Sequence, residues 1–475
     1  MRRCLVVLAL AASCGGGAPA LPPLAPVNTD PYRAEVAAQV APLLASQLVD
    51  ALVVGLVDGE RTFVFGFGKV GAGASPDGAT VFELGSVSKV FTGILLADAI
   101  ERGEVAADAA IVSLLPMGIT APGSGERPIT LLDLAAHRSG LPSLPPAIEA
   151  RVHTADPYAG YGEDALLRDL ARARLRAAPG RQVHYSNWGY GLLGYLLASR
   201  DGAPYAATLT TRVLAPLGLV DTFQQVPAGR AGRHAAGHDA LGRVAPFWTF
   251  TPAMAGLGGL RSTTNDLLRL TRLLLDAHAA GGGRRGKPAP LAAALRRSLE
   301  PLPGADEASA APEAVAMAMG WQIDGAGRRW HNGSTGGFHA YLGVDLERRH
   351  GVVLLAATST AQVDRLVGPL FELLGGHAPE PLQLPGPDVL ARHAGRYALP
   401  GSVVEVRVDG KKLVAASPGE RPVRLAPISD DEYFIEEVGA VVVFARGEMV
   451  FVVGDQRVVA TRIGADGPAP APTPP

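Results

Sequence analysis

Strand-like patterns lie at both ends of a long, helix-rich stretch of the chain, and this arrangement constrains the fold most. Residues 51–57 and 61–67 are largely apolar and flank an Asp-Gly pair, which predicts a β-hairpin with a tight turn. Further strand signals return near residues 320–323, 341–346 and 352–357. We therefore predict one sheet that is assembled from segments far apart in sequence, with a mostly helical lobe between them.

The structural units follow from composition along the 475 residues. A chain of this length exceeds what one compact core usually organises, so two or three units are expected. Residues 376–388 are rich in Pro and Gly, as linkers are, and short β-type runs recur beyond them. We expect a main domain at residues 31–375, a small barrel-like all-β domain at 389–464, and a disordered Pro-rich tail at 465–475.

Residues 1–30 have the pattern of an export segment followed by a Pro-rich spacer. Two arginines precede an apolar run at residues 5–12, which is too short to span a bilayer. The sequence ending at Cys14 is similar to a bacterial lipoprotein cleavage site, and ordinary cleavage near Ala18 or Ala20 is the alternative. We expect an exported protein, periplasmic or anchored in the outer membrane, whose only membrane contact is a lipid on Cys14.

Charge and cysteine content argue against several classes of function. The chain has 43 basic and 45 acidic residues without long runs of either sign, so we expect no nucleic-acid partner. Both cysteines precede residue 15, which excludes disulfides, cysteine nucleophiles and Cys-ligated zinc downstream. The Gly-x-Gly-x-x-Gly match at residues 66–71 does not lead into a helix, and His234 and His238 lack a third ligand. We therefore expect no cofactor and no metal.

Ser86 and Lys89 form the first part of a candidate catalytic site. A serine hydroxyl is a poor nucleophile unless a neighbouring base removes its proton and nearby donors hold the oxyanion. If Ser86 opens the helix predicted over residues 86–102, Lys89 lies on the same face within reach of the hydroxyl. The spacing alone is weak evidence, because a helix-capping serine with a solvated lysine shares it. His137 is interpreted as a structural residue at a helix end, because Ser86 lacks the flanking glycines of a nucleophile elbow.

Two further motifs strengthen the interpretation. Tyr185-Ser186-Asn187 lies in a turn before an apolar helix, and His331-Asn332-Gly333-Ser334 lies where a strand pattern is interrupted by glycines. The order Ser-x-x-Lys, Tyr-x-Asn, His-x-Gly resembles the class C β-lactamase and D,D-peptidase (penicillin-binding) superfamily of serine hydrolases, with its esterase relatives. Segments such as FELGSVSKVFTGILL and AGLGGLRSTTNDLLRL are also similar, and the resemblance covers residues 49–463.

This resemblance implies an α/β fold, in which an antiparallel sheet is flanked by helices and joined to an all-helical lobe, with the small all-β domain appended. Residues 31–375 would then be the catalytic domain. The implied activity is hydrolysis of the amide or lactam bond of D-alanyl peptidoglycan peptides or β-lactams. A carboxylesterase acting on small acyl esters is the main alternative, and a non-catalytic penicillin-binding envelope protein is a third.

The resemblance also implies roles for individual residues. Ser86 would attack the carbonyl, Lys89 would assist its deprotonation, and Tyr185 would shuttle protons with a pKa lowered by nearby cations. The implied binding residues are Asn187, which would hold Lys89 and the substrate amide, Gly333, which would admit the substrate close to the strand, and Ser334, whose N–H would form the oxyanion hole with that of Ser86.

The motif departs from the family pattern at His331, where lactamases and peptidases most often have lysine. Histidine at this position also occurs among family esterases and peptidases. Because histidine is cationic only below its pKa, we expect His331 to bind a substrate carboxylate only in its protonated form. The alternative is a neutral His331 that donates one N–H to the bound acyl group or has a structural role.

Overall fold

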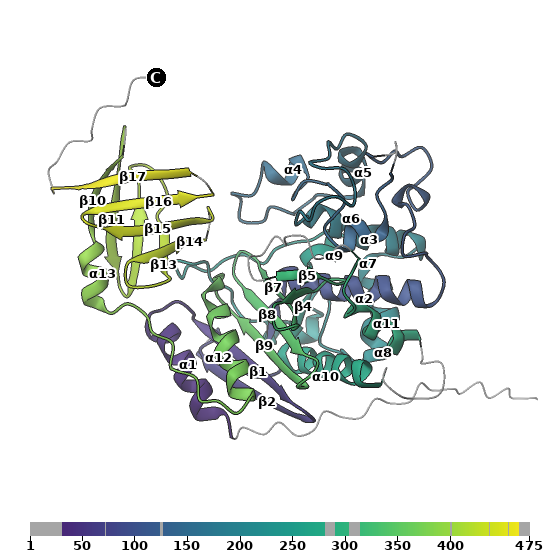
Figure 1. The fold of residues 1–475 in the computed structure, drawn as a ribbon, viewed down its shortest axis with the longest axis horizontal. Coiled ribbons are helices and arrows are strands. Elements are labelled where there is room, and N and C mark those ends of the chain that lie inside the picture. The colour runs from purple at the N-terminus through teal and green to yellow at the C-terminus, as the bar shows by residue number, and fades with distance from the viewer. Residues whose placement is uncertain are drawn as a thin grey trace, which may run out of the picture.

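A computed structural model shows a molecule in two parts, a larger one built around a sheet and a β-barrel joined to it (Figure 1). The structure describes residues 31–464 except 72, 124–126, 281–289, 304–313, 400, 437 and 455. The expected export segment with Cys14 and the expected C-terminal tail lie outside the described residues.

The helices are α1 (Arg33–Ala45), α2 (Ser88–Glu101), α3 (Leu131–Ala135), α4 (Pro146–Glu149), α5 (Glu163–Ala171), α6 (Asn187–Arg200), α7 (Tyr205–Leu209), α8 (Ala215–Leu217), α9 (Ala255–Gly258), α10 (Thr264–Ala280), α11 (Pro290–Ser298), α12 (Val367–Leu374) and α13 (Pro387–His393).

A seven-stranded antiparallel sheet forms the centre of the larger part, in the order β2-β1-β9-β8-β7-β6-β5. Its strands are β1 (Ala51–Asp58), β2 (Arg61–Gly68), β5 (Ala314–Met317), β6 (Gln322–Asp324), β7 (Arg329–Ser334), β8 (His339–Asp345) and β9 (His350–Ala356). Leu52 on β1 lies opposite Ala356 on β9, so the pairing joins segments roughly 300 residues apart. The predicted hairpin and the predicted sheet of distant segments are both confirmed.

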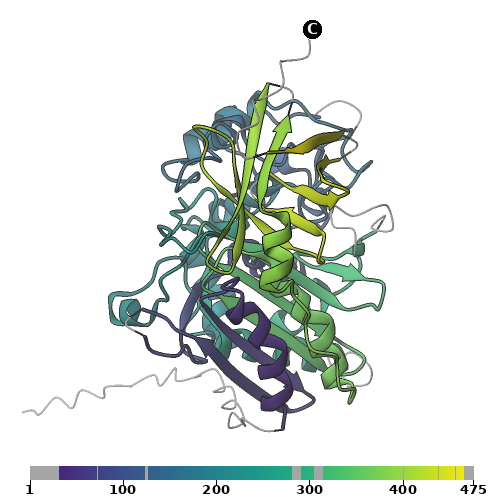
Figure 2. The same cartoon turned by 90° about the vertical axis from the view of Figure 1, so that its left-hand side faces the viewer.

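Different helices cover the two faces of this sheet. Successive side chains of a strand point to opposite faces, so Val53 on β1 packs into the core that contains α2 and α10, whereas Leu52 packs with α1 and α12. Figure 2 shows α1 in purple and α12 in green side by side on the outer face. The sheet is therefore buried on both sides, which explains why β1, β8 and β9 are apolar along almost their whole length.

The helical lobe surrounds α2, and every residue of α2 from Ser88 to Ala99 is buried. A helix that is apolar all round lies in a core and not at a surface, which agrees with the position of α2 between α6, α9 and α11. In a separate two-stranded sheet, β3 (Val81–Glu83), which lies just before α2 in the chain, pairs with β4 (Arg261–Thr263). It fixes the segment that leads into the helix.

The C-terminal part is a closed barrel of consecutive antiparallel strands, which confirms the expected small all-β domain. Its strands are β10 (Gly395–Leu399), β11 (Ser402–Asp409), β12 (Lys412–Ala416), β13 (Val423–Pro427), β14 (Glu432–Ile435), β15 (Ala440–Ala445), β16 (Glu448–Val453) and β17 (Gln456–Ile463). Alternate residues point inward, as in β15, where Val442 and Phe444 are buried. Closure leaves the barrel without a free sheet edge.

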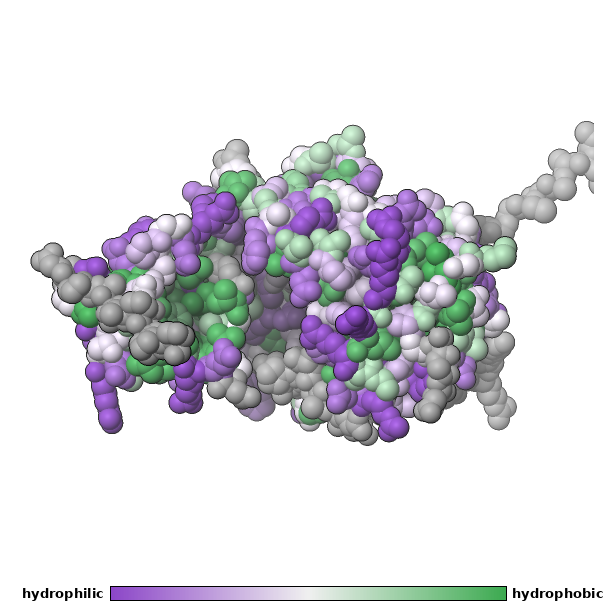
Figure 3. All heavy atoms as spheres, turned by 90° about the horizontal axis from the view of Figure 1, so that it is seen from above, coloured by the Kyte–Doolittle hydropathy of each residue, from purple (hydrophilic) through white to green (hydrophobic). Residues whose placement is uncertain are grey.

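Side chains of the barrel bind the larger part directly. Arg424 on β13 is 2% exposed and donates to the main-chain oxygens of Gln47 and Ala240, each at 3.0 Å. Glu436, after β14, accepts from Thr360 Oγ1 at 2.8 Å and from the N–H of Ala361 at 2.9 Å. Seen from above, the surface is hollowed between the barrel on the left and the larger part, and apolar residues gather on the barrel side of the hollow (Figure 3).

Within the described ranges, no helix combines the length and apolarity needed to cross a membrane.

Candidate active site

Ser86 lies in a single 3-10 turn, Gly85–Val87, that leads into α2. The expectation that Ser86 begins the α-helix is therefore wrong by one short turn. Gly85 has a φ of 49°, and a side chain at this position would lie 2.7 Å from the main-chain oxygen of Ser334. Only glycine accommodates both the left-handed backbone and this close approach, and the approach places Ser86 beside the end of β7.

Lys89 is completely buried, and its amine contacts three oxygen atoms. Its Nζ lies 2.8 Å from Ser86 Oγ, from Asn187 Oδ1 and from the main-chain oxygen of Leu257. Burial lowers the pKa of Lys89 well below 10.5, which favours the neutral amine. A neutral amine has two N–H donors for Asn187 and Leu257, and its lone pair then faces the Ser86 hydroxyl. This arrangement places the amine of Lys89 within reach of the Ser86 proton.

Tyr185 packs over the same amine, with Lys89 Nζ 4.9 Å from the centre of its ring. Burial raises the pKa of Tyr185 above 10, and a hydrogen bond with Ser86 only partly offsets this effect. The expectation that nearby cations lower this pKa is wrong, because the neighbouring amine is itself buried and favours the neutral form. Burial therefore favours the neutral phenol of Tyr185.

His137 holds Tyr185 in place, which the sequence did not indicate. Its ring packs 4.3 Å from the ring of Tyr185 and 4.9 Å from that of Tyr190, centre to centre. Its Nδ1 accepts the N–H of Ser186 at 3.0 Å. Burial lowers the pKa of His137 well below 6.5, so it is a neutral acceptor. The position of His137 at a helix end was expected. Its contact with Tyr185 was not, because roughly fifty residues of chain separate the two and only folding brings them together.

Gly333 brings β7 onto the nucleophile. A Cβ at this position would lie 2.4 Å from the main-chain nitrogen of Ser86 and equally close to the oxygen of Leu84. The next residue, Ser334, is exposed, and its main chain lies against Gly85. The sequence-predicted residues of the three motifs are therefore brought together around Ser86, with Asn187 at the start of α6 reaching it through Lys89.

Comparison with known proteins identifies the family. A family model described as Beta-lactamase matches residues 36–376, nearly the whole of the larger part. The chain belongs to the β-lactamase family. Penicillin-binding protein 4 of Amycolatopsis lactamdurans is 29% identical over 356 residues, which cover 70% of this chain and 88% of the relative. The D-alanyl-D-alanine-carboxypeptidase/endopeptidase AmpH of Escherichia coli K12 is 29% identical over 229 residues, 48% of this chain and 57% of AmpH.

Solved structures show that this β-lactamase family member is also similar to known proteins in its fold. A class C β-lactamase from Rhodobacter sphaeroides has a TM-score of 0.59 and 26% identity, and the match covers 72% of this chain and 99% of that one. The octameric penicillin-binding protein homologue from Pyrococcus abyssi has a TM-score of 0.61 at 20% identity and covers 90% of this chain and 99% of its own. The fold expected from the resemblance is confirmed.

His331 differs from the expectation of a titrating cationic residue. It is 1% exposed, and burial lowers its pKa to about 3. Its Nδ1 lies 2.5 Å from the main-chain oxygen of Asn332, so this nitrogen carries the proton of a neutral ring. The expectation that protonated His331 binds a substrate carboxylate is therefore wrong. A ring that is neutral above about pH 3 has no positive charge to attract a carboxylate at working pH.

A second polar cluster of the family site was missed in the sequence. Ser334 is hydrogen-bonded to His339, which is hydrogen-bonded in turn to Asp364, and Asn332 donates to the same carboxylate. The sequence offers the spacing of Ser334 and His339 as its only signal, because Asp364 enters from a segment beyond β9.

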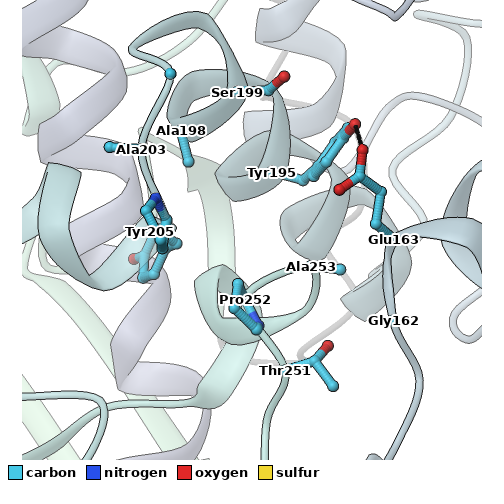
Figure 4. Close-up of a pocket in the computed structure, with 12 residues that line it drawn as sticks. Gly162, Glu163, Tyr195, Ala198, Ser199, Ala203, Tyr205, Thr251, Pro252 and Ala253 are labelled. Carbon is cyan, nitrogen blue, oxygen red and sulfur yellow. Dashed lines mark hydrogen bonds between the residues drawn. The ribbon is translucent and has the colours of Figure 1, made fainter.

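A pocket elsewhere in the helical lobe contains none of these residues. It has a volume of about 470 Å³ and lies between α6, α7 and residues 251–253, with Tyr195 donating to Glu163 at 2.7 Å on its wall (Figure 4). On this wall the carboxylate of Glu163 is paired with the phenol of Tyr195. Within the described part of the chain, no group of three or more His, Cys, Asp or Glu side chains is placed to hold a metal ion.

Proposed function

We propose that the protein is a serine hydrolase that forms an acyl-enzyme on Ser86. The observation that carries the proposal is the contact of 2.8 Å between Ser86 Oγ and the amine of Lys89, in a buried setting that favours the neutral base. The ring of Tyr185 lies 4.9 Å from the same amine and its hydroxyl is hydrogen-bonded to Ser86, which completes a path for the proton. Penicillin-binding and peptidase relatives support the same class of reaction.

The geometry supports the following sequence of steps. The Ser86 proton moves to Lys89 as Oγ attacks the substrate carbonyl, and the tetrahedral oxyanion faces the main-chain N–H groups of Ser86 and Ser334. The proton then passes from Lys89 through the Tyr185 hydroxyl to the leaving group, whose bond to the carbonyl carbon breaks. Water attacks the acyl-enzyme by the reverse path, and its proton returns to Ser86.

The proposed substrates are D-alanyl peptidoglycan peptides or β-lactams. The names of the relatives support this choice, and the expected export of the chain would bring it to those substrates. A carboxylesterase acting on small acyl esters is the second candidate. It is favoured by the neutral, buried His331, since an ester needs no cation at that position. The complete set of Ser86, Lys89 and Tyr185 argues for turnover and against a non-catalytic penicillin-binding protein.

Parallel assays of purified enzyme on nitrocefin, a D-Ala-D-Ala peptide and p-nitrophenyl acetate test the proposal. We expect turnover of at least one amide or lactam substrate, with the same loss in every active assay when Ser86 is replaced by alanine. Turnover of p-nitrophenyl acetate alone would favour the esterase. Absence of both turnover and covalent labelling at Ser86 would overturn the proposal.

We also propose that the mature protein is exported and anchored by a lipid on Cys14. The Cys14→Ser variant is expected to move from the membrane fraction to the soluble fraction, because two or three acyl chains supply most of the binding to the bilayer. Fractionation of cells that express both forms measures this shift. A protein that is soluble with or without Cys14 would instead indicate ordinary cleavage near Ala18 or Ala20.

A further inference from the structure

Glu83 is a buried carboxylate shortly before the nucleophile, and the steps proposed above do not use it. It is the last residue of β3, it is 2% exposed, and it lies opposite Arg261 on β4. Arg261 donates to Glu83 Oε1 at 2.7 Å, and the main-chain N–H of Trp248 donates to the same oxygen at 3.1 Å. A charge removed from water lowers stability unless it is paired, so these two donors compensate for the burial of Glu83.

Arg261 also binds the main chain of Trp248. Its guanidinium donates to the main-chain oxygen of Trp248 at 2.8 Å and to that of Gln224 at 2.6 Å. The N–H and the carbonyl of Trp248 are therefore each bound by one member of the same ion pair. We call Glu83, Arg261 and Trp248 the β3 clamp.

The indole of Trp248 lies against the turn that follows β7. A Cβ at Gly336 would lie 2.8 Å from Trp248 Nε1, which shows how closely the ring approaches this main chain. The same nitrogen is buried and has no hydrogen-bond partner in the described part of the chain. Tyr158 packs against the ring, 5.5 Å away between centres. Packing and the hydrogen bonds of its main chain therefore hold the indole in place.

This turn begins at Ser334, whose N–H is the expected second donor to the oxyanion. A Cβ at Gly85 would lie 2.8 Å from the main-chain nitrogen of Ser334. The end of β7 is thus contacted at two nearby points, at Ser334 by Gly85 and at Gly336 by Trp248. Gly85 follows Glu83 closely in the chain, and Trp248 is hydrogen-bonded to it. Both contacts therefore depend on the place of Glu83.

Thr335 gives Glu83 a further link to the same turn. Burial raises the pKa of Glu83 above 4.5, and Arg261 and the Thr335 hydroxyl both oppose this rise. No hydrogen bond of standard geometry joins Glu83 Oε2 to this hydroxyl, and both atoms are buried without another partner among the described residues. The carboxylate therefore attracts the end of β7 directly, as well as holding it through Trp248.

We propose that the β3 clamp positions the oxyanion hole. Glu83 and Arg261 hold Trp248 in place, and its indole keeps the turn after β7 from moving away from the nucleophile. The N–H of Ser334 then stays at the distance from the N–H of Ser86 that an oxyanion needs. The inference rests on the proposed function and deepens it, because it gives a role to a charge that touches neither the substrate nor the path of the proton. Glu83 and Arg261 are positioning residues.

Glu83→Ala in the full-length protein tests the inference. We expect labelling by a fluorophosphonate, measured as a rate per folded molecule, to fall roughly ten- to a hundredfold. Complete loss of one oxyanion donor usually costs about a hundred- to a thousandfold, and a displaced donor should cost less. The pH dependence of labelling should stay as in the wild type, because Lys89 keeps its contacts with Ser86, Asn187 and Leu257.

Phenylboronic acid measures the oxyanion hole itself. Ser86 Oγ adds to the boron and gives a tetrahedral adduct, in which a boron-bound oxygen occupies the place of the oxyanion. Its affinity for Glu83→Ala should therefore fall by about the same factor as the labelling rate. A residue that only stabilises the fold would lower neither quantity per folded molecule.

Two further variants separate positioning from folding. Glu83→Gln should recover most of the labelling rate, because its amide oxygen still accepts from Arg261 and from the N–H of Trp248. Trp248→Leu leaves the ion pair intact but removes the ring, and it should reproduce the loss seen with Glu83→Ala. Trp248→Leu therefore supplies the test if Glu83→Ala does not fold.

Asp98→Ala is the matched control. Arg212 donates to Asp98 at 2.7 Å, and these side chains are 12% and 0% exposed, against 13% and 3% for Arg261 and Glu83. Each variant removes the acid of a buried ion pair, so both should lower the temperature of unfolding. Only Glu83→Ala should lower the labelling rate and the affinity for phenylboronic acid.

Three results would overturn the inference: wild-type labelling by Glu83→Ala, a slower rate without weaker binding of phenylboronic acid, or an equal loss in Asp98→Ala. In each case, labelling of the wild-type protein at Ser86 would leave the proposed function standing. Absence of labelling in the wild-type protein would overturn the proposed function, and the inference with it.

Discussion

Replacing Ser86 with alanine is expected to abolish covalent labelling by a fluorescent penicillin or a fluorophosphonate. The hydroxyl is the atom that would form the acyl bond, so turnover should fall by at least about a thousandfold. Stability should change by about 1 kcal/mol or less, because Ser86 is half-buried and Lys89 keeps its contacts with Asn187 and Leu257. In-gel fluorescence and thermal unfolding measure the two effects.

Ser113→Ala is the matched control for this experiment. Ser113 also lies in a short 3-10 segment of the larger part, but it is exposed and its hydroxyl donates to the main-chain oxygen of Ala110. Labelling should be unchanged in this variant. Full labelling of a folded Ser86→Ala protein would remove Ser86 from the mechanism.

Lys89→Met and Tyr185→Phe are each expected to lower the acylation rate by at least about a hundredfold, the lower end of the usual contribution of general acid–base catalysis. Methionine fills the space of the lysine without a base, and phenylalanine keeps the ring against His137 without the proton. Because both residues act on one proton path, the double variant should lose much less than the product of the two single effects. Stopped-flow acylation under single-turnover conditions measures the three rates.

Tyr190→Phe is the control that separates chemistry from packing. Tyr190 packs against the same histidine, and its hydroxyl donates to the main chain of Ala135 at 2.7 Å. Loss of this hydroxyl should lower the stability of the protein but leave most of the acylation rate unchanged. A Tyr185→Phe protein that acylates as fast as Tyr190→Phe would show that the phenol of Tyr185 carries no proton in the reaction.

The sequence predicted those features that depend on local pattern or on a motif with fixed spacing. The hairpin of residues 51–67 follows from two largely apolar runs around Asp58-Gly59. Lys89 reaches Ser86 because of their separation along the helix entry. The strands β13 and β14 were harder to recognise, since β13 ends in Pro427 and β14 spans only Glu432–Ile435.

The ionisation of the site could not be predicted in the same way. The pKa directions of Tyr185 and His331 depend on how completely each ring is buried and on whether Lys89 remains charged, and a motif contains neither quantity. His137 and the main-chain oxygen of Leu257 reach the site through contacts between distant segments. Asp364 likewise comes from a segment that follows β9, so its hydrogen bond with His339 exists only in the folded chain.

The pairing of β1 with β9 also determines when the sheet can form. During synthesis, the apolar hairpin of β1 and β2 emerges early, but the partner of its open edge follows roughly 300 residues later. Until then that edge is free to pair with other chains, so nascent or truncated forms are prone to aggregation. A nonsense codon before β9 would separate the hairpin from β8 and β7, because β9 lies between them in the sheet. Loss of the segment from His350 to Ala356 therefore divides the sheet at its middle.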